Sequence, residues 1–146
     1  MGLRLTEIVV DCHDPAALAA FWSTALGYHI VRSDEDQVEI APWEQEPADL
    51  GEQVRRSPRA PVLVFAAVPE GKVVKNRLHL DVRPVDSDYD AEVQRLIGLG
   101  ARRADIGQVS VPWAVLTDPE GNEFCLLGPL PAPDGSAAGS IKDSRA

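Results

Sequence analysis

The sequence lacks the features of secreted and membrane proteins. It contains only two cysteines, Cys12 and Cys125, which is too few for a disulfide framework and fits a reducing compartment. No apolar run approaches the roughly 20 residues that a membrane helix requires. Residues 1–7 do not form the long apolar core of a signal peptide. These absences predict a cytoplasmic protein that does not associate with a membrane.

Basic residues are also scarce. The chain carries 23 acidic residues against 14 basic ones, for a net charge of -9. Basic pairs occur at Arg55-Arg56 and Arg102-Arg103, but no basic cluster is present. Contacts with phosphates need clustered Lys and Arg, so we do not expect a nucleic-acid partner. An acidic surface is compatible with cationic small ligands, although most surface charges serve solubility.

The first half of the chain reads as one strand, one helix and three more strands. Residues 6–12 are β-rich and alternate, with Glu7, Val9 and Asp11 on one face. Asp14-Pro15 is a helix start, and Gly27 is a natural helix end. The later strands are predicted at 28–32, 37–41 and 61–68.

The second half repeats this plan. An alternating strand at 77–83, with His79, Asp81 and Arg83 on one face, precedes a helix at 86–99 that ends at Gly100. Glu7 lies 20 residues before Gly27, and His79 lies 21 residues before Gly100. The similar offset predicts a βαβββ unit used twice. The later strands are expected at 101–106, 109–117 and 122–127, the last with Glu123 and Cys125 on one face.

Two stretches lack strong periodicity. Residues 42–60 are polar and contain Trp43, and a loop of this length is usually functional or mobile. Residues 129–146 are rich in Pro, Gly, Ala and Ser, and this composition predicts a disordered tail. Trp43 and Trp113 do not belong to a helical stripe. Each could stack on a planar or cationic ligand or serve a structural role.

Together these motifs resemble the vicinal oxygen chelate superfamily, which includes glyoxalase I, bleomycin resistance proteins and extradiol dioxygenases. Asp14, Phe21-Trp22 and Leu26-Gly27 resemble its first module, and Trp113 with the turn 118–122 resembles the end of its second. The stretches 76–81 and 122–125 resemble its glyoxalase-like domain sub-group.

The resemblance covers about residues 3–128 and implies an α+β fold. Two βαβββ modules, at about 3–68 and 76–128, would form one domain over 1–128. Their open, curled mixed sheet would surround a cleft, with the helices on the outer faces. The superfamily also implies a homodimer and a small-molecule ligand or substrate.

Metal-dependent relatives bind a divalent ion through inward-facing His, Gln or Glu. By resemblance these positions fall on Glu7, His79 and Cys125, and the fourth falls near Phe65 or Ala66, which cannot ligate. Glu7, His79 and Cys125 could bind zinc with a water in the open position, whereas sulfur suits manganese less well. Iron is a further candidate.

The metal-free alternative is a polar network around the same residues. His79, with Glu7 or Asp81, could act as a general acid or base, and Cys125 could act as a nucleophile if His79 lowered its pKa. We favour a protein that binds a small molecule in the cleft without the usual metal set and without a cofactor. The alternative is a metal-dependent or His-based lyase, isomerase or dioxygenase. The predicted ligand-binding residues are Glu7, Asp11, Trp43, His79, Asp81, Trp113, Glu123 and Cys125.

Overall fold

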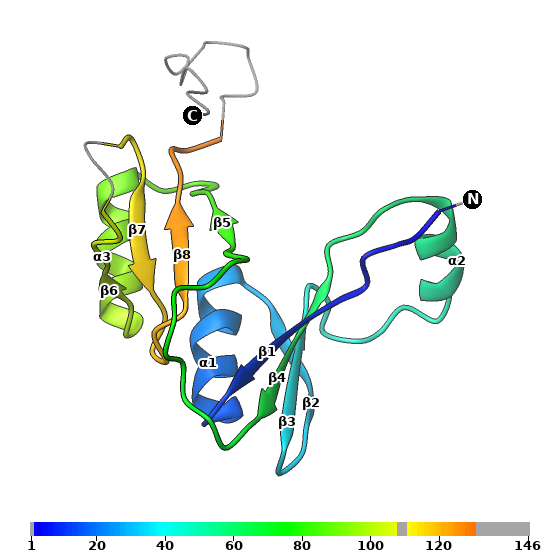
Figure 1. Cartoon of the computed structure of the whole chain (residues 1–146). Helices are drawn as coiled ribbons and strands as arrows, with labels where there is room; N and C mark the ends of the chain where they lie inside the picture. The colour runs from blue at the N-terminus through cyan, green and yellow to red at the C-terminus, as the bar shows by residue number, and fades with distance from the viewer. Residues whose placement is uncertain (1, 108–110, 131–146) are drawn as a thin grey trace. The chain divides into compact units, whose positions relative to one another are not determined.

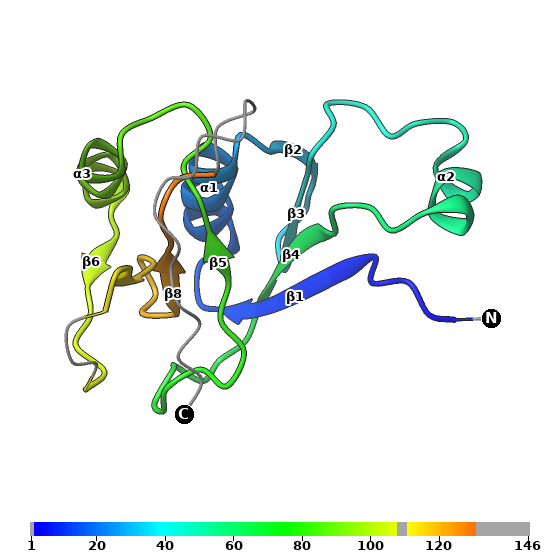
Figure 2. The ribbon, with the colours of Figure 1, turned by 90° about the horizontal axis from the view of Figure 1, so that it is seen from above.

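A computed structural model of the chain describes residues 2–107 and 111–130. The chain divides into two compact units, Met1–Val74 and Lys75–Ala146. Figure 1 shows the elements of both units, and Figure 2 shows them from above.

The first unit is a βαβββ module with one inserted helix. Its four-stranded mixed sheet has the order β1-β4-β3-β2. β1 runs parallel to β4, and the other neighbours are antiparallel. Its elements are β1 (Glu7–Cys12), α1 (Pro15–Leu26), β2 (His29–Ser33), β3 (Gln37–Ala41), α2 (Leu50–Arg56) and β4 (Val62–Ala67).

Helix α1 begins and ends where the sequence predicts. The Asp14 carboxylate accepts a hydrogen bond from the Ala17 backbone N–H at 3.0 Å, and Pro15 occupies the first turn. Gly27 ends the helix in the left-handed region, with φ 67°, which glycine adopts without a steric penalty. The helix packs on β3 and β4, and its buried side chains include those of Leu18 and Trp22.

The second unit repeats the module. Its sheet has the order β5-β8-β7-β6, so the strands are arranged as in the first unit. The duplicated βαβββ plan and the α+β class are therefore confirmed. The elements are β5 (Asp81–Val82), α3 (Tyr89–Leu99), β6 (Arg102–Arg103), β7 (Ala114–Thr117) and β8 (Glu123–Leu126).

Helix α3 starts later than the sequence predicts. The Asp88 carboxylate accepts from the backbone N–H groups of Asp90 and Ala91, so the cap lies at Asp88. An aspartate at this position supplies an acceptor for N–H groups that have no partner within the helix. Val93 and Leu96 are the buried side chains of this helix.

The prediction of a strand over 77–83 is wrong for its first half. β5 comprises only Asp81 and Val82, and Leu78 is 91% exposed. The first backbone hydrogen bond to β8 joins the Cys125 N–H to the Leu80 carbonyl. The alternating pattern is present before Leu80, but a strand also requires a partner for its ladder hydrogen bonds.

The strand predicted at 101–106 is also shorter. β6 pairs only Arg102 with Thr117 and Arg103 with Leu116. The Asp105 carboxylate then accepts from the Gly107 N–H at 2.9 Å, and this local turn ends the pairing. The strand predicted at 109–117 begins at Ala114 where it is described, and its first two predicted residues lie outside the described residues.

The stretch 42–60 is not entirely a loop, because it contains helix α2. The short helix has Glu52 in its first turn and Arg55 and Arg56 in its last, as the helix dipole favours. Arg56 pairs with Glu52 at 2.9 Å, one helical turn away. The Arg4 guanidinium donates to the Val54 carbonyl at 3.0 Å, so the N-terminal segment lies beside α2, as Figure 1 shows.

The turn between β7 and β8 is organised by a buried aspartate. Asp118 is 2% exposed, and its carboxylate accepts from the Glu120 N–H, the Asn122 N–H and the Asn122 side-chain amide. Gly121 adopts a φ of 88°. The connection is therefore short and tightly bonded, as expected for an Asp-Pro-Glu-Gly-Asn turn.

Among the described residues, no helix has both the length and the apolar character needed to span a bilayer. The predicted tail at 129–146 lies, from residue 131 onward, outside the described residues.

Candidate functional site

The first module presents a polar face on its sheet. In β1 the burial alternates, with Glu7, Val9 and Asp11 exposed and the residues between them more buried. The same register places Glu39 of β3 beside Val64 of β4 on this face. The predicted alternation of Glu7, Val9 and Asp11 is therefore confirmed.

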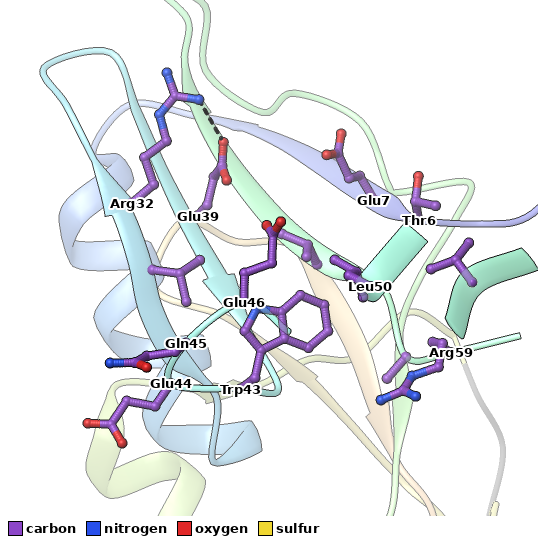
Figure 3. A pocket seen from close by; sticks show the side chains of 14 residues that line it. Thr6, Glu7, Arg32, Glu39, Trp43, Glu44, Gln45, Glu46, Leu50 and Arg59 are labelled. Atoms are coloured by element: carbon purple, nitrogen blue, oxygen red, sulfur yellow. Dashed lines mark hydrogen bonds and ion pairs between the residues drawn. The ribbon is translucent and has the colours of Figure 1, made fainter. Parts of the chain in front are cut away.

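A pocket of about 550 Å³ lies on this face of the first module. Its wall comes from strands β1 to β4 and from the segment 43–60, which includes α2. Figure 3 shows Trp43 and Glu46 in the middle of the lining side chains. The volume lies within the roughly 300–1,000 Å³ typical of small-molecule sites.

The pocket lining is acidic. Four carboxylates contrast with two guanidinium groups, those of Arg32 and Arg59. Arg32 pairs with Glu39 at 3.4 Å and with Asp34 at 3.7 Å, so much of its charge is compensated. The carboxylates are those of Glu7, Glu39, Glu44 and Glu46.

Apolar side chains complete the pocket. Val31, Leu50, Val54 and Val62 contribute to the lining beside the indole of Trp43. A site that combines an aromatic ring, aliphatic side chains and excess carboxylates suits an organic cation, because the ring face and the carboxylates both attract positive charge.

The second module carries a different cluster. Asp81 of β5 is the register partner of Cys125 of β8, and His79 lies two residues before Asp81. His79 Nδ1 lies 3.1 Å from Asp81 Oδ1. One ligating atom from each of the three side chains lies within 4.8 Å of the others.

The Cys125 thiol is held in its protonated form. Burial is the main cause that raises its pKa to about 11, and the neighbouring Asp81 carboxylate contributes by its charge and by accepting a hydrogen bond. The Lys75 ammonium opposes this shift. The hypothesis that His79 lowers the pKa of this thiol is therefore wrong, because burial and Asp81 dominate and act in the opposite direction.

The other predicted site residues belong to neither of these two groups. Asp11 is exposed on the polar face of β1 but is not part of the pocket lining. Glu123 accepts a hydrogen bond from the Asn76 backbone N–H at 2.9 Å, which ties the segment before β5 to β8. Trp113 lies immediately before β7 and is half-buried.

Only part of the pocket was predictable from the sequence. Glu7 and Trp43 were predicted, whereas Arg32, Glu39 and Glu46 were missed. Glu39 alternates with buried Val38 and Ile40 in β3, so the face of the sheet on which Glu39 lies could be predicted from the sequence. The polar stretch around Trp43 indicated that Glu46 belongs to a functional or mobile loop. The conformation of that stretch could not be predicted from its sequence.

The sequence profile of the glyoxalase-like domain matches residues 7–127, which span both modules. The chain belongs to the glyoxalase-like domain family. No curated protein matches the sequence.

Several solved structures are similar to this chain in fold. A glyoxalase/bleomycin resistance protein/dioxygenase family enzyme from Burkholderia phytofirmans PsJN is 21% identical, with a TM-score of 0.60, and the match covers 88% of this chain and 100% of that one. A possible glyoxalase from Bacillus cereus is 13% identical, with a TM-score of 0.58, covering 86% of this chain and 99% of that one. These similarities establish the fold.

A fosfomycin resistance protein from Listeria monocytogenes shows a ligand on the same fold. A mutant of that protein was solved with Mn(II) and 1S,2S-dihydroxypropylphosphonic acid. It is 12% identical, with a TM-score of 0.61, and the match covers 89% of this chain and 95% of that one.

The donor groups of this glyoxalase-like domain fit a divalent metal only in part. The side chains of Phe65 and Ala66 carry no nitrogen, oxygen or sulfur atom. Neither of these β4 positions therefore supplies a side-chain ligand. His79 and Cys125 lie together with Asp81 as nitrogen, sulfur and oxygen donors. The predicted participation of Glu7 in this set stays a prediction. The donors present fit an ion that accepts sulfur.

Proposed function

We propose that this glyoxalase-like protein binds an organic cation in the pocket of its first module and releases it chemically unchanged. The observation that carries this proposal is the combination of Trp43 with an excess of carboxylates around a volume of about 550 Å³. This function refines the predicted small-molecule binding by assigning it to a defined group of residues in the first module. The cleft between modules and the homodimer stay predictions.

The electrostatics of the pocket give the ligand its class. Beyond the Arg32–Glu39 pair, the lining holds the carboxylates of Glu7, Glu44 and Glu46 against the single guanidinium of Arg59. A planar aromatic cation would stack on Trp43 and satisfy nearby carboxylates, with a cation–π contribution of about 0.5–2 kcal/mol. An anionic ligand would meet repulsion from the same groups.

Calorimetric titration tests the proposal. The probe is a planar phenanthridinium dye, compared with a neutral ring system of the same size. Tighter binding of the cation, with mass spectrometry recovering it unmodified after long incubation, is the expected result. Equal affinity for both compounds, or conversion of the cation to a product, would contradict the proposal.

The second candidate function is a His-based or metal-dependent lyase, isomerase or dioxygenase. The His79–Asp81 contact at 3.1 Å favours it, because a carboxylate orients an imidazole for proton transfer. Turnover of a small-molecule substrate that is lost in His79→Gln and retained in Trp43→Leu would support this candidate over the first.

A further inference from the structure

His79, Asp81 and Cys125 offer three kinds of ligating atom in one small volume. The ligating atoms lie within 4.8 Å of one another. In a tetrahedral zinc site the donor atoms are about 3.3–3.6 Å apart, given Zn–S near 2.3 Å and Zn–N or Zn–O near 2.0–2.1 Å. The side chains of His79 and Asp81 are 41% and 45% exposed, so small rotations can bring them toward the buried sulfur.

We propose that His79, Asp81 and Cys125 bind a zinc ion through a three-ligand site supplied by the second module alone. A zinc ion held by three protein atoms takes its fourth ligand from water or from a substrate. The proposal does not depend on the cation pocket, because no residue of that pocket belongs to the second module.

The donor set distinguishes the expected metal from that of a relative. The Listeria protein was solved with Mn(II). Mn(II) prefers carboxylate and water oxygens, whereas one thiolate and one imidazole suit zinc. The sulfur at Cys125 therefore changes the metal that this chain selects.

Zinc binding would change the bonding of the Cys125 thiol. In the metal-free state the Cys125 thiol donates a hydrogen bond to Asp81. When zinc binds, the thiol proton is released to solvent as the sulfur–zinc bond forms. The positive charge of Lys75 opposes the ion.

Metal analysis and cobalt substitution test the site. Tag-free protein, stripped with a chelator and reloaded, is expected to retain zinc in a one-to-one ratio. Cobalt(II) should give a sulfur-to-metal charge-transfer band in the near ultraviolet. That band should persist in Cys12→Ser, the matched control at the only other cysteine, and disappear in Cys125→Ser.

A second variant tests the site without a substitution at a buried residue such as Cys125. His79→Gln changes an exposed side chain, so circular dichroism should show a native fold. Its zinc affinity should fall by more than the roughly 10–100-fold that loss of an outer-sphere partner costs. Competition with Mn(II) should leave zinc bound.

Several results would overturn the site. These are a failure of the stripped protein to take up zinc, a cobalt band that survives Cys125→Ser, and preference for Mn(II) over zinc. Unchanged zinc affinity in a folded His79→Gln protein would equally reject the three-ligand set.

Discussion

The two modules share a strand order but differ in how their last two strands are connected. In the first module the segment between β3 and β4 spans 42–61 and contains α2, whereas β7 and β8 are joined by the turn 118–122. The long connection walls a pocket lined by Trp43 and carboxylates. The short one leaves Cys125 beside Asp81 and His79. One topology thus presents two different chemistries, because chemistry depends on the site and not on the fold.

The largest expected effect comes from the core aromatic side chains of β4 and β8. Phe65 and Phe124 are 0% and 1% exposed. Each substitution to Ala should lower the free energy of unfolding by about 3–5 kcal/mol through lost burial and a residual cavity. Urea denaturation followed by circular dichroism measures this. A loss below about 1 kcal/mol for either variant would show that its module does not depend on this core.

The next effect concerns the short connection. Asp118→Ala leaves the N–H groups of Glu120 and Asn122 without their carboxylate acceptor. We expect a loss of about 2–3 kcal/mol, since a charged acceptor is removed from a buried site. Asp34→Ala is the matched control, because Asp34 is an exposed turn aspartate that accepts from the Asp36 N–H. Thermal melts showing equal losses for both variants would contradict the structural role of Asp118.

A smaller effect tests the long connection. The double variant Glu7→Gln and Glu46→Gln keeps the shape of the pocket but removes two negative charges. Its affinity for the phenanthridinium cation should fall by about 1–2 kcal/mol, or roughly 5–30-fold, while affinity for the neutral analogue stays unchanged. Asp11→Asn is the control on the same sheet face. Calorimetry showing equal losses for the cation and the neutral compound would reject the electrostatic account.

The smallest expected effect on stability concerns a difference between the two long helices, α1 and α3. α1 buries five residues, whereas α3 buries two and carries an ion pair between Glu92 and Arg95. Hydrogen bonding from Arg95 holds the pKa of Glu92 below its usual 4.5. The stabilisation is therefore complete above that pH and is lost as the pH falls through the lowered pKa.

Glu92→Gln should accordingly cost about 0.5–1 kcal/mol at pH 7 and progressively less in acid. Chemical denaturation at several pH values measures the difference between the two proteins. A constant or increasing difference toward low pH would contradict this sign.

Helices α1 and α3 and the duplication could be predicted because the helix-start and helix-end signals are local. Asp14, Pro15 and Gly27 act on the backbone next to them, and Gly100 repeats the pattern. The edge strands β5 and β6 could not be predicted, because alternation does not reveal how far a partner strand extends. Leu78 alternates correctly and is nevertheless 91% exposed.

The site residues were predictable only within one strand at a time. The alternation placed His79 with Asp81, but the pairing of Asp81 with Cys125 depends on the register of β5 and β8. The pocket required α2, which has no buried residues and so no apolar stripe to reveal it. The sequence therefore indicated which residues share a polar face of a strand, but not how those residues group.

Backbone amide chemical-shift mapping tests the central claim, which is that the two modules carry different sites. The protein would be titrated separately with the phenanthridinium cation and with zinc. We predict that the cation shifts resonances around Glu7, Arg32 and Trp43, and that zinc shifts those around Asp81 and Cys125. Perturbation of one shared set of residues by both ligands would contradict the account.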